Sequence, residues 1–116
     1  MPVRIYGIKN CDTMKKARTW LDQRKVAYTF HDYKTRGLER VELETWVAHF
    51  GWERVLNRAG TTFRGLPDGQ KQGLDAEKAV SLMLDHLSLI KRPVLALEDG
   101  RLLIGFKPED YAAAIG

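Results

Sequence analysis

Cysteine is nearly absent from this 116-residue chain, which contains only Cys11. A single cysteine excludes an internal disulfide, and proteins without disulfides are typical of a reducing compartment. Long apolar runs are also lacking, since none approaches the ~20 residues needed to span a membrane. The first residues enter a strand directly and lack the apolar segment of a secretory signal peptide. These absences predict a cytoplasmic protein that has no membrane partner.

Several binding signatures are missing as well. His31, His49 and His86 are scattered and have no cysteine partners at zinc-ligand spacing, so no metal site is predicted. No phosphate-binding glycine loop or nucleotide fingerprint occurs. The net charge of +4 is a mild surplus that suits anionic small molecules. The basic residues near the N-terminus lack interleaved exposed aromatic residues, which argues against nucleic acid as a partner.

What the sequence does contain is a regular succession of strand and helix patterns. The first three patterns form a β-α-β unit, whose strands should be parallel and joined by a right-handed crossover. A helical block follows, and the chain ends in a β-hairpin with an Asp99–Gly100 turn and a last helix. This order predicts an α/β protein with a thioredoxin-like fold and one domain over residues 1–116. The expected strands are 3–8, 26–33, 94–97 and 102–104. Helices are expected at 12–24, between 37 and 51, at 52–56, after a cap at Asp75 and from Pro108. The helical insertion is expected to span about 37–90 and to include a loosely structured stretch at 61–72.

Cys11 lies at the junction of the first strand and the first helix. Asn10 is the expected N-cap, which places Cys11 in the first helical turn, where backbone N–H groups lack partners and the helix dipole is positive. These N–H groups, the Thr13 hydroxyl and the charge of Lys9 all favour the thiolate, which is the nucleophilic form. We therefore predict that Cys11 is a low-pKa nucleophile. The alternative that the residues leave open is a buried, inert thiol.

Four segments in this order resemble a known family. They are the strand–cysteine–helix start at 6–17, Asn-Arg-Ala-Gly at 57–60, Lys-Arg-Pro-Val at 91–94 and Lys-Pro-Glu at 107–109. Together they cover essentially the whole chain and resemble the glutaredoxin-dependent arsenate reductases of the ArsC type, most of all their YffB branch. The Spx transcriptional regulators are a sister branch of the same family.

The resemblance implies a set of roles. In the arsenate reductases the cysteine attacks arsenate, glutathione reduces the adduct and glutaredoxin resolves the product. Three basic residues cradle the oxyanion, and these roles would fall on Arg58, Arg92 and Lys107, which would also bind the carboxylates of glutathione. Pro93 would be the cis-proline beside the active cysteine. No permanently bound cofactor is implied, because glutathione acts as a co-substrate.

The chain departs from that pattern at several positions. Gly7 stands where the reductases carry a histidine, Lys107 replaces an arginine, and Asp12 places a negative charge beside the thiol. We therefore predict a glutathione-dependent thiol reductase that acts through a mixed disulfide on Cys11. Lys9 and Thr13 are also expected at the site. Whether arsenate is the substrate stays open. Spx-like binding to RNA polymerase is the alternative. Those regulators usually sense oxidation with a Cys-x-x-Cys pair, and Met14 occupies the second position here.

Overall fold

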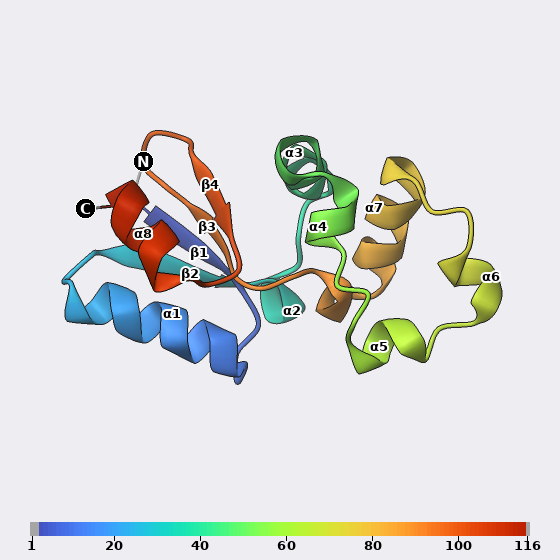
Figure 1. Cartoon of the computed structure of the whole chain (residues 1–116), viewed down its shortest axis with the longest axis horizontal. Coiled ribbons are helices and arrows are strands. Elements are labelled where there is room, and N and C mark those ends of the chain that lie inside the picture. Colours follow the sequence, from blue (N-terminus) through green and yellow to red (C-terminus); the bar gives the residue numbers. More distant parts are fainter. Residues whose placement is uncertain (1–2, 116) are drawn as a thin grey trace. The chain divides into compact units, whose positions relative to one another are not determined.

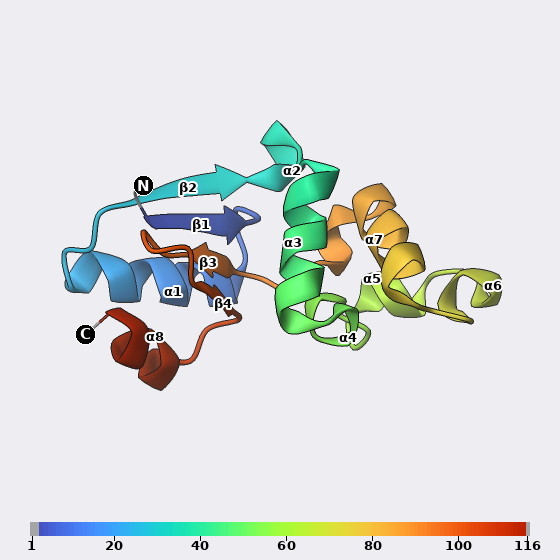
Figure 2. The ribbon, with the colours of Figure 1, turned by 90° about the horizontal axis from the view of Figure 1, so that it is seen from above.

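A four-stranded mixed sheet organises one part of the computed structural model, which describes residues 3–115. Its strands are β1 (Val3–Gly7), β2 (Tyr28–Asp32), β3 (Val94–Ala96) and β4 (Leu102–Ile104), in the order β2-β1-β3-β4 (Figure 2). Strand β1 pairs parallel with β2 and antiparallel with β3, and β3 pairs antiparallel with β4. The predicted parallel pair, the hairpin and the thioredoxin-like α/β fold are thus confirmed.

Helices α1 (Asp12–Gln23) and α8 (Pro108–Ile115) pack on this sheet (Figure 1). The buried residues of α1 recur at helical spacing and form one side of the core. Alternate residues of the sheet strands form the other side. Tyr111 of α8 meets the Trp20 ring edge-on, with 5.6 Å between centroids. Each fully buried large apolar side chain contributes about 1.5–3 kcal/mol. The main members of this core are Val3, Ile5, Met14, Ala17, Trp20, Leu21, Leu95 and Tyr111.

A second compact unit comprises residues 37–91, where the sequence predicts a helical insertion. Its buried side chains include Leu43, Trp46, Val55, Val80 and Met83. The prediction of one domain over 1–116 stays a prediction. The elements of this unit are α3 (Arg40–Phe50), α4 (Trp52–Val55), α5 (Thr61–Arg64), α6 (Asp68–Lys71), α7 (Ala76–Asp85) and the 3₁₀-helix η1 (Leu87–Leu89).

Local chemistry explains where the elements of the helical unit begin and end. Asp75 caps α7 as predicted, because its side chain accepts the backbone N–H of Lys78 at 2.8 Å. Gly51 ends α3 with φ +89°, a left-handed conformation that glycine adopts without strain. The segment that follows α4 pairs with the last residues of the unit: the Asn57 N–H donates to Leu89 O at 2.8 Å, and the Lys91 N–H donates to Val55 O at 2.8 Å.

The short helix after β2 was not predicted, nor were α5 and α6 within the stretch expected to be loosely structured. The sequence suggests a strand over 26–33, whereas β2 covers Tyr28–Asp32 and α2 (Tyr33–Arg36) follows at once. Asp32 causes the change: its Oδ1 accepts the Lys34 N–H at 3.0 Å, and its carbonyl accepts the Thr35 hydroxyl at 3.1 Å. Such local bonds compete with a continued strand. Among the described residues, no helix is both long and apolar enough to cross a membrane.

Candidate active site

Cys11 lies just beyond the carboxyl end of β1, where α1 begins. The predicted Asn10 cap is wrong, because Asn10 adopts φ +68° and Cys11 itself is the N-cap residue, with extended backbone at φ −105° and ψ 131°. Asparagine tolerates the left-handed conformation better than most residues, so it turns the chain instead of capping the helix. Cys11 therefore lies one position ahead of the first turn, at the place from which a side chain reaches the N–H groups two and three residues on.

The surroundings of the Cys11 sulfur favour its ionised form. The thiol makes no regular cap hydrogen bond, yet the N–H groups of Thr13 and Met14 face it, as does the Arg92 guanidinium. Burial raises the pKa of Cys11, but the Met14 N–H, the hydrogen bond and charge of Arg92 and the Thr13 N–H together lower it, and the net pKa lies below the ordinary value. Thr13 acts here through its backbone, whereas the sequence suggests its hydroxyl.

Sheet pairing brings Arg92 to Cys11. Val94, the first residue of β3, pairs with Tyr6 of β1, and the two strands are antiparallel. Arg92 therefore lies beyond the carboxyl end of β1, the edge where ligands bind in open α/β sheets. Its side chain is half-buried, and its guanidinium lies beside the Cys11 sulfur. The Arg92–Pro93 peptide bond is cis, as predicted, and Pro93 is buried.

Tyr33 is a member of the site that the sequence interpretation missed. The parallel register pairs Asp32 with Gly7, so Tyr33 reaches the same edge of the sheet. Tyr33 is fully buried, and its hydroxyl lies near the Arg92 guanidinium without making a hydrogen bond to any residue that the structure describes. Burial raises the pKa of Tyr33 well above its usual range, and the nearby charge of Arg92 offsets only part of this effect. The sequence signal that could have identified Tyr33 is its position at the end of the predicted second strand, which runs parallel to β1.

Asp32 ties the two loops of this edge together. Its Oδ2 accepts the backbone N–H of Lys9 at 3.3 Å, and its Oδ1 accepts the Lys34 N–H. One carboxylate thus joins the loop before Cys11 to the start of α2. The Lys9 side chain itself is exposed.

The two other predicted basic residues are placed differently. Lys107 is exposed at the start of α8, where its carbonyl accepts the Tyr111 N–H at 3.1 Å. Arg58 belongs to the helical unit; its guanidinium lies 3.9 Å from a Glu53 oxygen and 5.4 Å from the centre of the Trp52 ring. Their roles toward Cys11 stay predictions.

Gly7 and Met14 explain one departure from the arsenate reductase pattern. A Cβ atom at Gly7 would lie 2.2 Å from the Met14 sulfur, and Met14 is itself buried in the core. The space next to the strand end is therefore filled by the thioether. A side chain at position 7, histidine included, requires Met14 to move.

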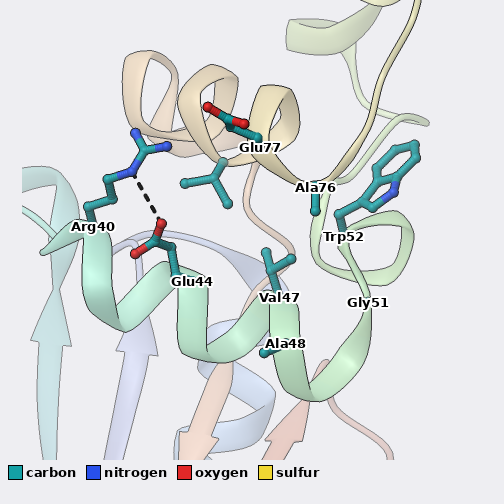
Figure 3. A pocket seen from close by; sticks show the side chains of 9 residues that line it. Arg40, Glu44, Val47, Ala48, Gly51, Trp52, Ala76 and Glu77 are labelled. Carbon is teal, nitrogen blue, oxygen red and sulfur yellow. Dashed lines mark hydrogen bonds and ion pairs between the residues drawn. The ribbon is translucent and has the colours of Figure 1, made fainter.

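The helical unit carries a separate cavity of about 530 Å³ between α3 and the start of α7 (Figure 3). Val47, Val80 and Trp52 contribute apolar surface, and at its rim Arg40 pairs with Glu44 at 3.4 Å. Within residues 3–115, no group of three or more His, Cys, Asp or Glu side chains is placed to hold a metal ion.

The chain is similar to proteins of one known family. The ArsC family model matches residues 6–114. The solved structure of the YffB (PA3664) protein is 62% identical, covers 98% of this chain and 99% of its own, and superposes with a TM-score of 0.95. An arsenate reductase (ArsC) related protein from Brucella melitensis is 55% identical over 97% of this chain and 93% of its own, with a TM-score of 0.77.

Two curated relatives extend the comparison. A Haemophilus influenzae protein of uncharacterised function is 42% identical, over 97% of each chain. The global transcriptional regulator Spx of Streptococcus mutans is 26% identical, over 96% of this chain and 81% of its own. Since the family model spans nearly the whole chain and the fold matches, the protein belongs to the ArsC family.

Proposed function

We propose that this protein is a glutathione-dependent thiol reductase whose nucleophile is Cys11. One observation carries the proposal: the Cys11 sulfur faces two backbone N–H groups and the Arg92 guanidinium, all of which stabilise a thiolate. The thiolate is the reactive form in thiol–disulfide exchange. Membership of the ArsC family supports the same chemistry.

The proposed reaction consists of two exchanges. In the first, the Cys11 thiolate attacks the glutathionyl sulfur of a mixed disulfide, RS–SG; the Cys11–SG bond forms, the RS–SG bond breaks and RS⁻ leaves with the electron pair. In the second, a glutathione thiolate attacks the Cys11–SG bond, releases the Cys11 thiolate and forms oxidised glutathione. The net change is RSSG + GSH → RSH + GSSG.

The second exchange needs a thiol from outside the chain. Cys11 is the sole cysteine, and Met14 occupies the position where a resolving cysteine would stand. Glutathione itself or a glutaredoxin would supply that thiol. The proposal therefore places the protein in a reducing compartment such as the cytoplasm.

Basic residues would hold the anionic groups of glutathione and of the substrate. Arg92 is beside the sulfur, and a guanidinium binds carboxylates and oxyanions bidentately. Lys9, Arg58 and Lys107 are further candidates for binding these anionic groups. Thr13 is close to Cys11 in the sequence, and Pro93 directly follows Arg92. Lysine at 107 binds as a point charge and lacks the bidentate geometry of an arginine, so it does not select between a carboxylate and a tetrahedral oxyanion.

A regulatory role is the second candidate, and the likeness to Spx favours it. A Spx-like protein would bind RNA polymerase, and its Cys11→Ser variant would bind equally well. An enzyme would not bind RNA polymerase, and its turnover would be lost in the Cys11→Ser variant.

The test is turnover of purified protein with glutathione and a glutathionylated peptide, with oxidised glutathione as the measured product. A parallel reaction supplies arsenate in place of the peptide. We expect turnover with the peptide, none in Cys11→Ser, and a glutathionyl adduct on Cys11 in intact mass. Turnover with arsenate alone would reassign the substrate, and no turnover with either would overturn the proposal.

A further inference from the structure

The cavity of the helical unit takes no part in the proposed chemistry. All of its lining residues lie between positions 40 and 80, whereas Cys11 and Arg92 belong to the unit that contains the sheet. Its volume of about 530 Å³ lies within the range of about 300–1,000 Å³ that is typical of small-molecule sites. The chemistry of its walls therefore indicates what it can bind.

The walls of the cavity are largely apolar. Helix α3 contributes Val47 and helix α7 contributes Val80, and both side chains are buried, with exposed fractions of 9% and 3%. Trp52, the first residue of α4, lines the cavity as well and stays partly exposed. Ala76, at the start of α7, adds only a methyl group and so leaves room beside these side chains. The cavity thus offers both aliphatic and aromatic surface to the apolar body of a ligand.

The charged side chains of the lining are one guanidinium and two carboxylates, which leave a net charge of −1. The guanidinium already has partners, because Arg40 Nε lies 3.4 Å from Glu44 Oε2 and both Arg40 Nη atoms lie 3.5 Å from Ser81 Oγ. Figure 3 shows Arg40 and Glu44 joined on α3, with Glu77 on α7. Glu77 is exposed and forms no ion pair with any residue in the described range 3–115. The carboxylate of Glu77 is therefore available to a ligand.

We propose that this cavity binds a small organic cation, a protonated amine attached to an aliphatic or aromatic body. The body lies against Val47, Val80 and Trp52, and the ammonium group faces the Glu77 carboxylate. Indole rings attract cations, and the Trp52 ring centre already lies 5.4 Å from the guanidinium carbon of Arg58. An anion would be repelled by the net negative charge of the lining. This binding activity goes beyond the proposed reaction at Cys11 and does not depend on it.

The experiment titrates three probes of similar size into the unaltered protein and follows the backbone and indole N–H signals by NMR. The probes are phenethylamine, which is a cation, phenethyl alcohol, which is its uncharged counterpart, and phenylacetate, which is an anion. We expect phenethylamine to shift the signals of Val47, Trp52 and Val80. It should bind about twofold to fivefold more tightly than phenethyl alcohol, which is the effect expected of a solvent-exposed ion pair. Phenylacetate should bind most weakly.

Two glutamates at the same helical position give a matched comparison. Glu77 and Glu109 are the second residues of α7 and α8, and both are exposed. Glu77→Gln should make the amine and the alcohol bind equally, whereas Glu109→Gln should leave the ratio of their affinities unchanged. Equal affinities in the unaltered protein would overturn the proposal, as would a Glu77→Gln variant that keeps the preference for the amine.

A variant that fills the cavity tests where the amine binds. Ala76→Leu adds a larger side chain to the lining at an exposed helical position, which leucine suits well, so folding should be retained. Circular dichroism checks the fold of this variant, and all three probes should lose their binding. Amine binding that persists in the folded variant would contradict the proposal.

A dilution series without any probe examines the alternative occupant, a second copy of the chain. If the signals of Val47, Trp52 and Val80 move with protein concentration, the second copy fills the cavity and the proposal is wrong. We expect these signals to stay in place. None of these measurements contains glutathione, so a failure here is distinct from a failure of the proposed function at Cys11.

Discussion

At the scale of single residues, the Cys11 sulfur faces donors from two distant parts of the chain. Thr13 and Met14 contribute backbone N–H groups from the start of α1, while Arg92 reaches the sulfur from the start of β3. The backbone donors are present in any protein with a cysteine at a helix N-cap, whereas the guanidinium depends on the fold. The Arg92 side chain is therefore the group whose removal tests the site most selectively.

Replacing Arg92 by alanine should raise the pKa of Cys11 and slow its alkylation at pH 7 by roughly tenfold. A hydrogen bond to a charged group is worth about 1.5–3 kcal/mol, and the lower end applies because Cys11 is partly exposed. Arg92→Lys should restore much of the pKa effect but less of the glutathione binding, since the bidentate geometry is lost. Arg101→Ala is the control, because Arg101 pairs with Asp99 at 2.7 Å. Equal rates for Arg92→Ala and the control would contradict this prediction.

The lowered pKa of Cys11 also predicts a pH-dependent stability. Between the folded pKa and the unfolded value of about 8.5, the unfolded chain binds more protons, so the free energy of unfolding rises with pH. The stabilisation is fully present above about 8.5 and is lost as pH falls through the folded pKa. Urea unfolding of the unaltered protein and of Cys11→Ser measures it, because other groups cancel in the difference. A pH-independent difference would show that folding leaves the thiol pKa unchanged.

At the scale of elements, the junction of β1 and α1 is packed without spare room. Gly7→Ala should lower the free energy of unfolding by about 1–3 kcal/mol, the usual cost of overpacking, because the new Cβ meets the Met14 sulfur. The same change should cost less in a Met14→Ala background. Gly69→Ala is the control, since nothing lies within 4 Å of its new Cβ. Equal costs in both backgrounds, measured by urea unfolding, would show that Met14 is not the obstacle.

The cap of α7 gives a test in the helical unit. Asp75→Ala should lower the free energy of unfolding by about 0.5–2 kcal/mol, whereas Asp75→Asn should retain most of it, because an amide oxygen can still accept the Lys78 N–H. Thermal unfolding of the two variants measures the difference. Equal melting temperatures for both would mean that the cap does not stabilise α7.

Most elements were predictable because their signals are local. Periodicity located the strands and the main helices, and Asp75, Asp99–Gly100 and Pro108 marked a cap, a turn and a helix start as expected. Asn10 was misassigned because the same side chain suits both a cap and a left-handed turn, and the choice depends on how the loop closes. Helix α2 was missed because it depends on hydrogen bonds of Asp32 with its neighbours.

The site was less predictable than the fold. The family resemblance placed Cys11 and Arg92 together, and the structure brings their side chains into contact. Tyr33 carries no motif, because a tyrosine after a strand usually belongs to the core. Its place at the same edge of the sheet as Cys11 emerges only when β1, β2 and β3 are paired in register. Arg58 and Lys107 are long side chains whose partners a sequence does not specify.

At the scale of the whole molecule, a chain with one cysteine cannot complete a thiol–disulfide cycle alone. The proposed reaction therefore begins on a glutathionyl disulfide and ends with an external thiol. This requirement distinguishes it from a Cys-x-x-Cys sensor, which closes an internal disulfide. The central claim is therefore that Cys11 is both activated and accessible to glutathione.

The most direct measurement is the pH dependence of Cys11 glutathionylation by oxidised glutathione, followed by intact mass. The account predicts one glutathionyl adduct, a rate that reaches half its maximum below about 8.5, the ordinary cysteine pKa, and removal of the adduct by reduced glutathione. No adduct, or a midpoint at or above about 8.5, would contradict the claim that Cys11 is an activated nucleophile.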